Sequence, residues 1–260
     1  MSDILKIDNL SKYFGGIAAV SNCSFNVKKG SITGIIGPNG SGKTTLFNLI
    51  AGNLKSSNGT VLFDEENITD IPSYELFSKG LLRTFQIAHE FSNLTVLENL
   101  MMVPGNQSGE KLMTALFKPS LVIQEETVVK EKAKDVVNFL NLGHLSNELA
   151  GNLSGGQKKL LELGRTMMVD AKLVLLDEVG AGVNRTLLKD LGTAIEKLNK
   201  EKGYTFCMIE HDMDFIGRLC DPVIVMAEGS VLFEGSVEDA KKDEKVIESY
   251  LGRGSRLKDN

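Results

Sequence analysis

The segment "GPNGSGKTT", at residues 37–45, has the spacing of a loop that holds the phosphates of a nucleotide. It follows the apolar stretch "ITGII" and precedes "TTLFNLI", so the sequence predicts a strand, a loop and a helix in that order. Glycines let the backbone curl until successive N–H groups point at phosphate oxygens. Lys43 is then expected to reach the β- and γ-phosphates, and the Thr44 hydroxyl to ligate Mg²⁺. The residues expected to bind the nucleotide are Gly37, Asn39, Gly40, Ser41, Gly42, Lys43, Thr44 and Thr45.

Two carboxylates, Asp177 and Glu178, end the apolar run "KLVLLDE". Ligands of open α/β sheets bind beyond the carboxyl ends of the strands. Asp177 suits Mg²⁺, held through water. Glu178 is the next residue and points elsewhere, so it is expected to orient or deprotonate an attacking water. Alone, the pair is equally typical of an exposed acidic strand end, but a phosphate loop in the same chain favours the catalytic interpretation.

A second candidate for anion binding is "LSGGQ", at residues 153–157. A serine and two glycines open a predicted helix there, and the first turn of a helix has N–H groups that can bind an anion. A serine-capped helix that follows a glycine turn would contain the same residues and need no ligand. These residues alone leave both interpretations open.

Apolar runs of strand length alternate with helical periodicity in the last third of the chain, in "LVLLDE", "LLKDLGTAIEKLN", "YTFCMIEH" and the hairpin "PVIVMAEGSVLFEG". This alternation predicts an α/β core with a parallel sheet. The first third is predicted to contain short strands such as "ILKID", "CSFNV" and "TVLFDEENI", and the middle to be helical. In the middle, Ala133, Val136, Val137 and Leu140 recur at helical spacing and are predicted to pack on neighbouring elements.

The chain has 260 residues, 42% of them hydrophobic, and a formal net charge of −5. That length fits one large domain or two small ones, and the acidic balance argues against nucleic acid as the main partner. Cys23, Cys207 and Cys220 lie far apart and form no CxxC pair, so free, buried thiols are predicted. No apolar run is long enough to cross a bilayer, and "MSDILKIDNL" does not resemble a signal peptide. We therefore expect an intracellular protein that only another protein would bring to a membrane.

The phosphate loop, Gln86, the "LSGGQ" signature, the "LLDE" strand end and His211, in this order, resemble the ATP-binding subunits of ABC transporters. The signature is specific to that family, and the resemblance covers nearly the whole chain. It implies ATP and Mg²⁺ as ligands. It also implies an α/β P-loop NTPase core of the ABC type, with an N-terminal antiparallel β subdomain and an inserted α-helical subdomain. We expect one ATPase domain at residues 1–252, the helical insert at about 88–165 and a frayed tail at 253–260.

The resemblance also implies roles for single residues. Phe14 matches the aromatic side chain that stacks on adenine, with Tyr13 as a weaker candidate and packing in the sheet as the alternative. Gln86 matches the glutamine that touches Mg²⁺ or water and links to the membrane subunits. His211 matches the histidine near the γ-phosphate. The implied catalytic set is Lys43, Glu178 and His211, and the implied Mg²⁺ ligands are Thr44, Gln86 and Asp177.

Two motifs face a partner in that family, where two subunits pack head to tail and ATP lies between them. The signature residues expected to face the γ-phosphate held by the other subunit are Ser154, Gly155, Gly156 and Gln157. The residues that match the D-loop, which lines the subunit contact, are Ala181, Gly182, Val183 and Asn184. The family usually has proline after the catalytic glutamate, and often after the D-loop. This chain has Val179 and Arg185 there, which leaves the D-loop conformation and the hydrolysis rate open.

The stretches "LLRTFQIAHEFSNLTVLENL", "AGVN" and "EHDM" narrow the resemblance to ATPases of branched-chain amino-acid importers of the LivG type. This implies an ATP-hydrolysing motor, peripheral on the cytoplasmic face of the cell membrane. Its partners would be transmembrane permease subunits and a second ATP-binding subunit, either a related distinct chain or a copy of itself, and indirectly a substrate-binding protein. Alternatives are the same motor serving urea, amides or lipid export, a soluble ABC-type ATPase acting on ribosomes or DNA, and a regulatory subunit without useful hydrolysis.

Overall fold

Two compact units make up the chain in the computed structural model, which describes residues 2–84, 90–105 and 107–251. Unit 1 comprises Met1–Arg83, Lys172–Gly180 and Ile195–Asn260, and unit 2 comprises Thr84–Ala171 and Ala181–Ala194. The segment 88–165, expected as a helical insert, falls within the limits of unit 2. Gln86 and the expected frayed tail at residues 253–260 lie outside the described residues.

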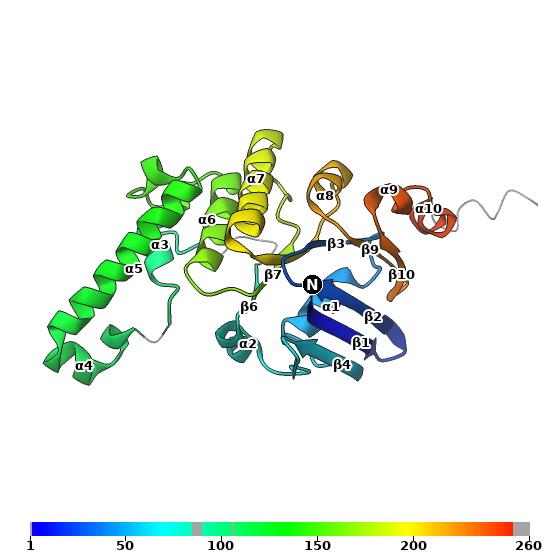
Figure 1. Cartoon of the computed structure of the whole chain (residues 1–260), viewed down its shortest axis with the longest axis horizontal. Coiled ribbons are helices and arrows are strands. Elements are labelled where there is room, and N and C mark those ends of the chain that lie inside the picture. The colour runs from blue at the N-terminus through cyan, green and yellow to red at the C-terminus, as the bar shows by residue number, and fades with distance from the viewer. Residues whose placement is uncertain (1, 85–89, 106, 252–260) are drawn as a thin grey trace, which may run out of the picture. The chain divides into compact units, whose positions relative to one another are not determined.

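The N-terminal part of unit 1 forms an antiparallel sheet in the order β2-β1-β4-β5 (Figure 1). Its strands are β1 (Asp3–Phe14), β2 (Ile17–Lys28), β4 (Asn58–Phe63) and β5 (Glu66–Asn67). The stretch "TVLFDEENI" was wrongly predicted to be one strand. Asp64 and Glu65 adopt positive φ angles of 50° and 68°, and this two-residue turn reverses the chain between β4 and β5. Neither residue is glycine or asparagine, so the turn had no strong sequence signal.

A six-stranded sheet, also in unit 1, has the order β10-β9-β3-β8-β7-β6. Its strands are β3 (Ile32–Ile36), β6 (Leu81–Arg83), β7 (Leu173–Asp177), β8 (Thr205–Ile209), β9 (Val223–Ala227) and β10 (Ser230–Gly235). All neighbours pair in parallel except β9 and β10, which form the predicted hairpin. Every residue of β3, β7 and β8 is buried, as expected of parallel strands covered on both faces. The α/β prediction is therefore confirmed.

One buried cluster joins the two sheets of unit 1 through α1 (Lys43–Ile50). On β3, Ile35 belongs to this cluster, whereas Gly34 faces the other way. A Cβ at Gly34 would lie 3.2 Å from Ile216 of α8 (Met213–Leu219), so α8 packs closely on that opposite face. The three cysteines are free and buried, as predicted. The other helices of unit 1 are α2 (Ser73–Lys79), α9 (Val237–Ala240), α10 (Glu244–Leu251) and the C-terminal part of α7 (Arg185–Lys202).

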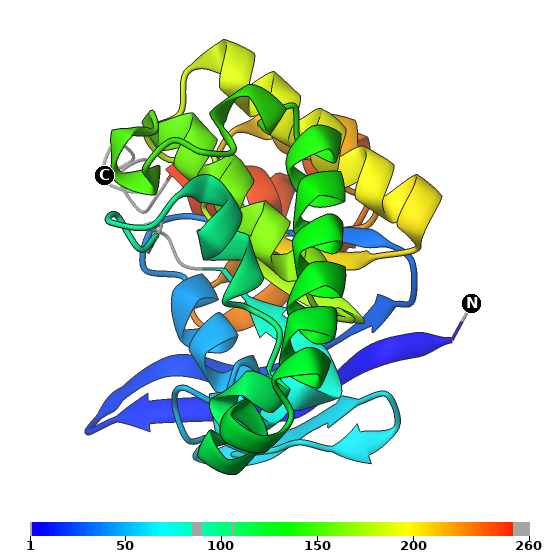
Figure 2. The same cartoon turned by 90° about the vertical axis from the view of Figure 1, so that its left-hand side faces the viewer.

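Unit 2 is helical, and its longest helix is α5, with the short α4 at its N-terminal end (Figures 1 and 2). Its helices are α3 (Val96–Met101), α4 (Leu112–Phe117), α5 (Pro119–Phe139), α6 (Gly155–Met167) and the N-terminal part of α7. Short 3₁₀ turns lie at η1 (Ser108–Glu110), η2 (Gly143–Leu145) and η3 (Ala150–Asn152).

The C-terminal half of α5 packs on α3 and α6. Its buried residues include Ala133, Val136 and Val137, and Leu140 follows at its end, as the helical spacing predicted. A Cβ at Gly164 of α6 would lie 2.7 Å from Leu140, so α6 approaches the end of α5 closely. Within the described residues of both units, none of the helices has the length and apolar composition needed to span a bilayer.

Candidate active site

The phosphate loop connects β3 to α1, as predicted, and two of its glycines have no room for a side chain. Gly37 has a φ of 149°, and a Cβ there would collide with the carbonyl oxygen of Met226. Gly42, the residue before α1, has a φ of 98°, and a Cβ there would collide with the carbonyl oxygen of Ala19. These are the first and sixth residues of the motif, so its two defining glycines are required by local geometry. The loop leads into the N-terminus of α1, which favours a bound anion.

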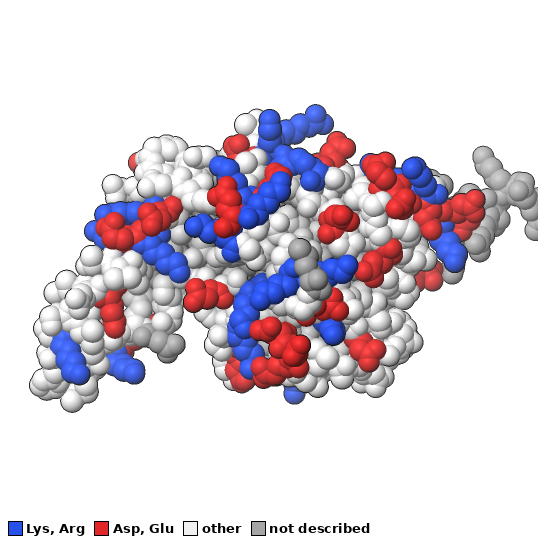
Figure 3. Space-filling view, in the orientation of Figure 1, with Lys and Arg blue, Asp and Glu red and all other residues white. Residues whose placement is uncertain are grey.

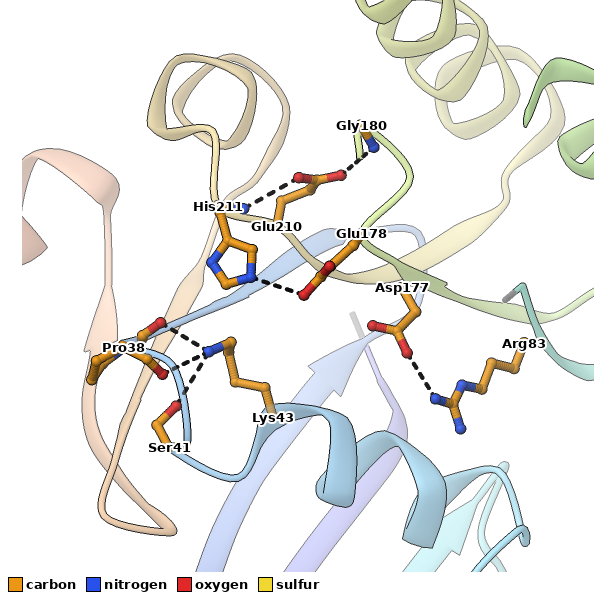
Figure 4. A network of polar contacts seen from close by, with 10 residues as sticks. Pro38, Ser41, Lys43, Arg83, Asp177, Glu178, Gly180, Glu210 and His211 are labelled. Atoms are coloured by element: carbon orange, nitrogen blue, oxygen red, sulfur yellow. Dashed lines mark hydrogen bonds and ion pairs between the residues drawn. The ribbon is translucent and has the colours of Figure 1, made fainter. Parts of the chain in front are cut away.

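Lys43, the first residue of α1, turns back over the phosphate loop (Figure 4). Its ammonium donates hydrogen bonds to the carbonyl oxygens of Gly37 at 2.8 Å and Pro38 at 2.9 Å, and lies 3.4 Å from the Ser41 hydroxyl. Burial lowers the pKa of Lys43, and the nearby Glu178 carboxylate partly offsets that shift. A buried cation is thus held inside the loop that is expected to receive phosphate.

Asp177 ends β7 and is paired with an arginine that the sequence analysis did not identify. Its Oδ2 lies 2.7 Å from Nη2 of Arg83, and both side chains are almost fully buried, at 5% and 10% exposure. Arg83 ends β6 and also donates to Oδ1 of Asn48 on α1, at 2.6 Å. Strands β6 and β7 pair in parallel, so Arg83 and Asp177 lie at the same edge of the sheet. The ion pair therefore fixes the Asp177 carboxylate at the edge where ligands of such sheets bind.

Glu178 follows Asp177 directly and has a φ of 48°, a left-handed conformation that is strained for a residue with a side chain. Its backbone N–H donates to the carbonyl oxygen of Ile209, the last residue of β8, at 2.9 Å. Its Oε1 lies 2.9 Å from Nε2 of His211. The two predicted catalytic side chains are therefore in contact, although they lie 33 positions apart in the sequence.

Glu210, directly before His211, is a second residue that the sequence analysis missed. Its carboxylate is buried and accepts hydrogen bonds from the backbone N–H groups of Gly180, at 2.6 Å, and His211, at 3.2 Å. Burial is the main cause of its raised pKa. Glu210 thus ties the chain just after Glu178 to the end of β8, at the point where the usual proline is replaced by Val179.

Phe14 ends β1, and half of its surface (50%) is exposed, so the ring is not packed inside the sheet. The adjoining strand β2 reaches the phosphate loop, because the Ala19 carbonyl lies against Gly42. The ammonium of Lys12 lies 5.3 Å from the ring centroid of Phe14.

In unit 2, the "LSGGQ" segment forms a reciprocal cap at the start of α6. Gln157 N–H donates to the Ser154 hydroxyl at 3.4 Å, and Ser154 N–H donates to Oε1 of Gln157 at 2.9 Å. A Cβ at Gly156 would lie 2.8 Å from Cβ of Leu187 on α7, whereas at Gly155 its nearest neighbour would be the Gly182 carbonyl at 3.9 Å. The serine-capped helix is therefore present, and Gly155 is left open beside the predicted D-loop.

The described residues thus bring Lys43, Asp177, Glu178 and His211 together at the carboxyl ends of neighbouring strands in unit 1 (Figure 4). Thr44 is exposed in the first turn of α1. Its hydroxyl and the Asp177 carboxylate are hard oxygen donors, the type that Mg²⁺ prefers. The third expected ligand, Gln86, lies outside the described residues. The predicted D-loop residues Ala181, Gly182, Val183 and Asn184 lie at the border of unit 2, where Oδ1 of Asn184 accepts a hydrogen bond from Leu187 N–H at 3.0 Å.

Comparison with known proteins agrees with this site. The model of the ABC transporter family matches residues 20–181, more than half of the chain. A probable branched-chain amino acid transport ATP-binding protein LivG of Archaeoglobus fulgidus is 44% identical, over 96% of this chain and 95% of that protein. The protein of the same name from Methanocaldococcus jannaschii is 42% identical, over 96% and 98% of the two chains.

Solved structures agree in fold. The ADP conformation of an ATP-binding cassette of an ABC transporter is 40% identical, with a TM-score of 0.82, and covers 97% of this chain and all of the other. A dimeric cassette in a post-hydrolysis state, bound to ADP and Pi, is 25% identical with a TM-score of 0.73, covering 90% and 98% of the two chains. The chain belongs to the ABC transporter family and has the fold of its ATP-binding cassettes. It is an ABC ATPase, and its similarity to the LivG proteins extends over nearly its full length.

Proposed function

We propose that this chain is the ATP-hydrolysing motor subunit of an ABC importer whose cargo is branched-chain amino acids. The observation that carries the proposal is the contact between Glu178 and His211 near the Lys43 phosphate loop, because it supports a joint role of this carboxylate and imidazole in attack on a γ-phosphate. The names of the two LivG relatives, at 44% and 42% identity, support the cargo.

In this mechanism, the N–H groups of the phosphate loop and the start of α1 hold the β- and γ-phosphates of ATP. Lys43 gives up carbonyl partners in the loop for phosphate oxygens and opposes the charge that spreads over the γ-phosphate. Glu178 orients a water and accepts its proton, and His211 holds the Glu178 carboxylate in place. Phe14 offers an exposed ring on which the adenine stacks.

Magnesium fits the oxygen donors of this site. Thr44 and, through water, Asp177 would hold it, with Gln86 as the further ligand that the family resemblance implies. When bound, the ion neutralises charge on the β- and γ-phosphates. The chain itself orients the Asp177 carboxylate for this role through its 2.7 Å pair with Arg83.

A second ATP-binding subunit completes the site in this proposal. The open side of Gly155 and the N–H groups at the start of α6 would face the γ-phosphate held by that partner, with the D-loop beside them. The dimeric cassette bound to ADP and Pi supports such an arrangement. The pair would work on the inner face of the cell membrane with permease subunits, and a substrate-binding protein would deliver the amino acid to them.

Glu178→Gln tests the chemical role. The amide keeps the size of the side chain and a contact to His211 but cannot accept the water proton. We expect ATP binding to persist and phosphate release by the complex with its membrane partners to fall by about a hundredfold or more. A matched control is Glu65→Gln, because Glu65 also has a positive φ and is exposed in the β4–β5 turn. Near-normal hydrolysis by Glu178→Gln would refute the proposed base.

A further inference from the structure

Helix α4 of unit 2 exposes a group of large apolar side chains that the ATPase mechanism does not use. Leu112, Met113, Leu116 and Phe117 are exposed by 75%, 67%, 64% and 72%. Their spacing places them along one side of the short helix. Contiguous apolar side chains that stand out this far mark contact sites on proteins or membranes. We refer to these four residues as the α4 patch.

Basic residues border the α4 patch at both ends. Lys111 precedes α4 and Lys118 follows it, and both are exposed. Residues 111–124 contain these two lysines and no aspartate or glutamate, in a chain whose net charge is −5. Figure 3 shows the same region, where Figure 1 places α4, as largely uncharged surface with blue basic groups on it. The acidic residues that flank this range are Glu110, which is exposed directly before Lys111, and Glu125, which is turned toward η1 and accepts hydrogen bonds from Ser108.

The patch is raised rather than hollowed. A cavity of about 440 Å³ lies near it, lined by residues of the loop before η1 and of α5, such as Pro104, Leu121 and Val128. None of the α4 residues is among those that line this cavity. A groove would suit an inserted helix of another protein, whereas protruding leucine, methionine and phenylalanine side chains with lysines beside them suit the boundary between headgroups and acyl chains.

From these observations we propose that the α4 patch inserts into the surface of an anionic lipid bilayer. The apolar side chains enter the boundary between headgroups and acyl chains, and Lys111 and Lys118 pair with lipid phosphates. Through this contact the ATPase binds the membrane directly, in addition to any binding through a permease. The inference does not depend on the cargo or on hydrolysis. The lipid contact can therefore be disproved while the proposed function stands, and the proposed function can be disproved while the lipid contact stands.

A single tryptophan reports the insertion directly, because the natural chain contains none. Phe117→Trp places the probe in the patch, and Tyr74→Trp is the matched control, since Tyr74 of α2 in unit 1 is equally exposed, at 73%. With vesicles of mixed phosphatidylcholine and phosphatidylglycerol, we expect a blue shift and quenching by brominated acyl chains for Phe117→Trp only. The proposal would be overturned by an unchanged spectrum at position 117, or by equal shifts at both positions.

Cosedimentation of the full chain with the same vesicles measures the contribution of the α4 patch and, separately, that of the two lysines beside it. Replacing the four apolar residues by serine should weaken binding at least about tenfold. Lys111→Gln and Lys118→Gln should each weaken it about fivefold on anionic vesicles. Lys28→Gln and Lys29→Gln, at exposed sites where β2 of unit 1 ends, serve as charge controls and should leave vesicle binding unchanged. No vesicle binding, combined with loss of permease assembly in the serine variant, would overturn the proposal and assign the patch to a protein partner.

Discussion

At the scale of single residues, Glu178 has a strained backbone conformation that hydrogen bonds from neighbouring residues stabilise. Its φ of 48° costs of order 1–3 kcal/mol for a non-glycine residue, and such strain persists only where neighbours impose it. Here the Glu178 N–H bonds to Ile209, its carboxylate contacts His211, and Gly180 is tied to Glu210. The surrounding hydrogen bonds therefore hold the carboxylate of Glu178, the proposed base, in one orientation, and they do so without the proline that commonly stiffens this stretch in the family.

The Arg83–Asp177 pair leads to a prediction about stability. Arg83→Met removes one partner of a buried ion pair and leaves the Asp177 carboxylate without its cation. We expect the free energy of unfolding, measured with urea in the absence of nucleotide, to fall by about 3 kcal/mol. Adding Asp177→Asn removes the buried charge and should recover a large part of that loss. Equal stability of Arg83→Met and the natural chain would contradict the assignment of this pair.

Glu210 leads to a prediction about pH. Burial raises its folded-state pKa above the ordinary value of 4.5, so the folded chain binds this proton more tightly than the unfolded chain. Its contribution to stability must then decrease as pH rises from the ordinary value through the raised one. Glu210→Gln keeps an acceptor for Gly180 N–H and removes the titration. The difference in unfolding free energy between variant and natural chain should shift in favour of the variant from pH 4 to pH 8. A difference independent of pH would contradict the burial argument.

Motif spacing and the end of an apolar strand located Lys43, Asp177 and Glu178, and the resemblance to ABC transporter subunits located His211. They did not locate Arg83, which lies 94 positions from Asp177 and ends a strand of three residues. Glu210 was also missed, because a glutamate beside a histidine has no pattern that separates a buried carboxylate from an exposed one. Each of these two residues bonds to a residue at or just beyond the end of a neighbouring strand, and which strands are neighbours is decided by the strand order of the sheet.

At the scale of elements, the start of α6 shows two glycines with different roles. Gly156→Ala would place a Cβ 2.8 Å from Leu187 Cβ, so α6 and α7 must shift apart within unit 2. We expect the free energy of unfolding to fall by about 1–3 kcal/mol. Gly155→Ala has room and should be tolerated. Leu187→Ala should recover only part of the loss in a double variant with Gly156→Ala, because it removes Leu187 Cδ1, 2.4 Å from the new Cβ, and keeps Leu187 Cβ. Equal costs for the two alanine substitutions would contradict the packing argument.

Elements with long apolar patterns were predictable, and short polar ones were not. The five-residue strands β3, β7 and β8 and the long helix α5 follow continuous or periodic apolar residues. Helix α2 was not predicted, because seven residues with only Leu76 buried give too little periodicity. The division of "TVLFDEENI" into β4 and β5 depends on Asp64 and Glu65 adopting positive φ angles, a conformation that Asp visits occasionally and Glu does not favour.

At the scale of the whole molecule, the proposed partner subunit can be tested at Gly155. Gly155→Asp adds a carboxylate at the first position of α6, where a helix N-terminus favours negative charge and the structure has space. The fold should therefore keep its stability in thermal unfolding. In the assembled complex, the same carboxylate would repel the γ-phosphate of the partner's ATP, so ATP-dependent association and hydrolysis should be lost. Normal hydrolysis by the Gly155→Asp complex would exclude α6 from the partner's site.

The most direct test of the motor is leucine uptake into vesicles that contain the complex purified from its own membranes, with ATP supplied on the side that carries this chain. The account predicts ATP-dependent accumulation of leucine with the natural chain and with Glu65→Gln, and its loss with Glu178→Gln. Accumulation that survives Glu178→Gln would contradict the motor role of this site. Hydrolysis that depends on Glu178 but moves no leucine would leave the ATPase in place and reject branched-chain amino acids as its cargo.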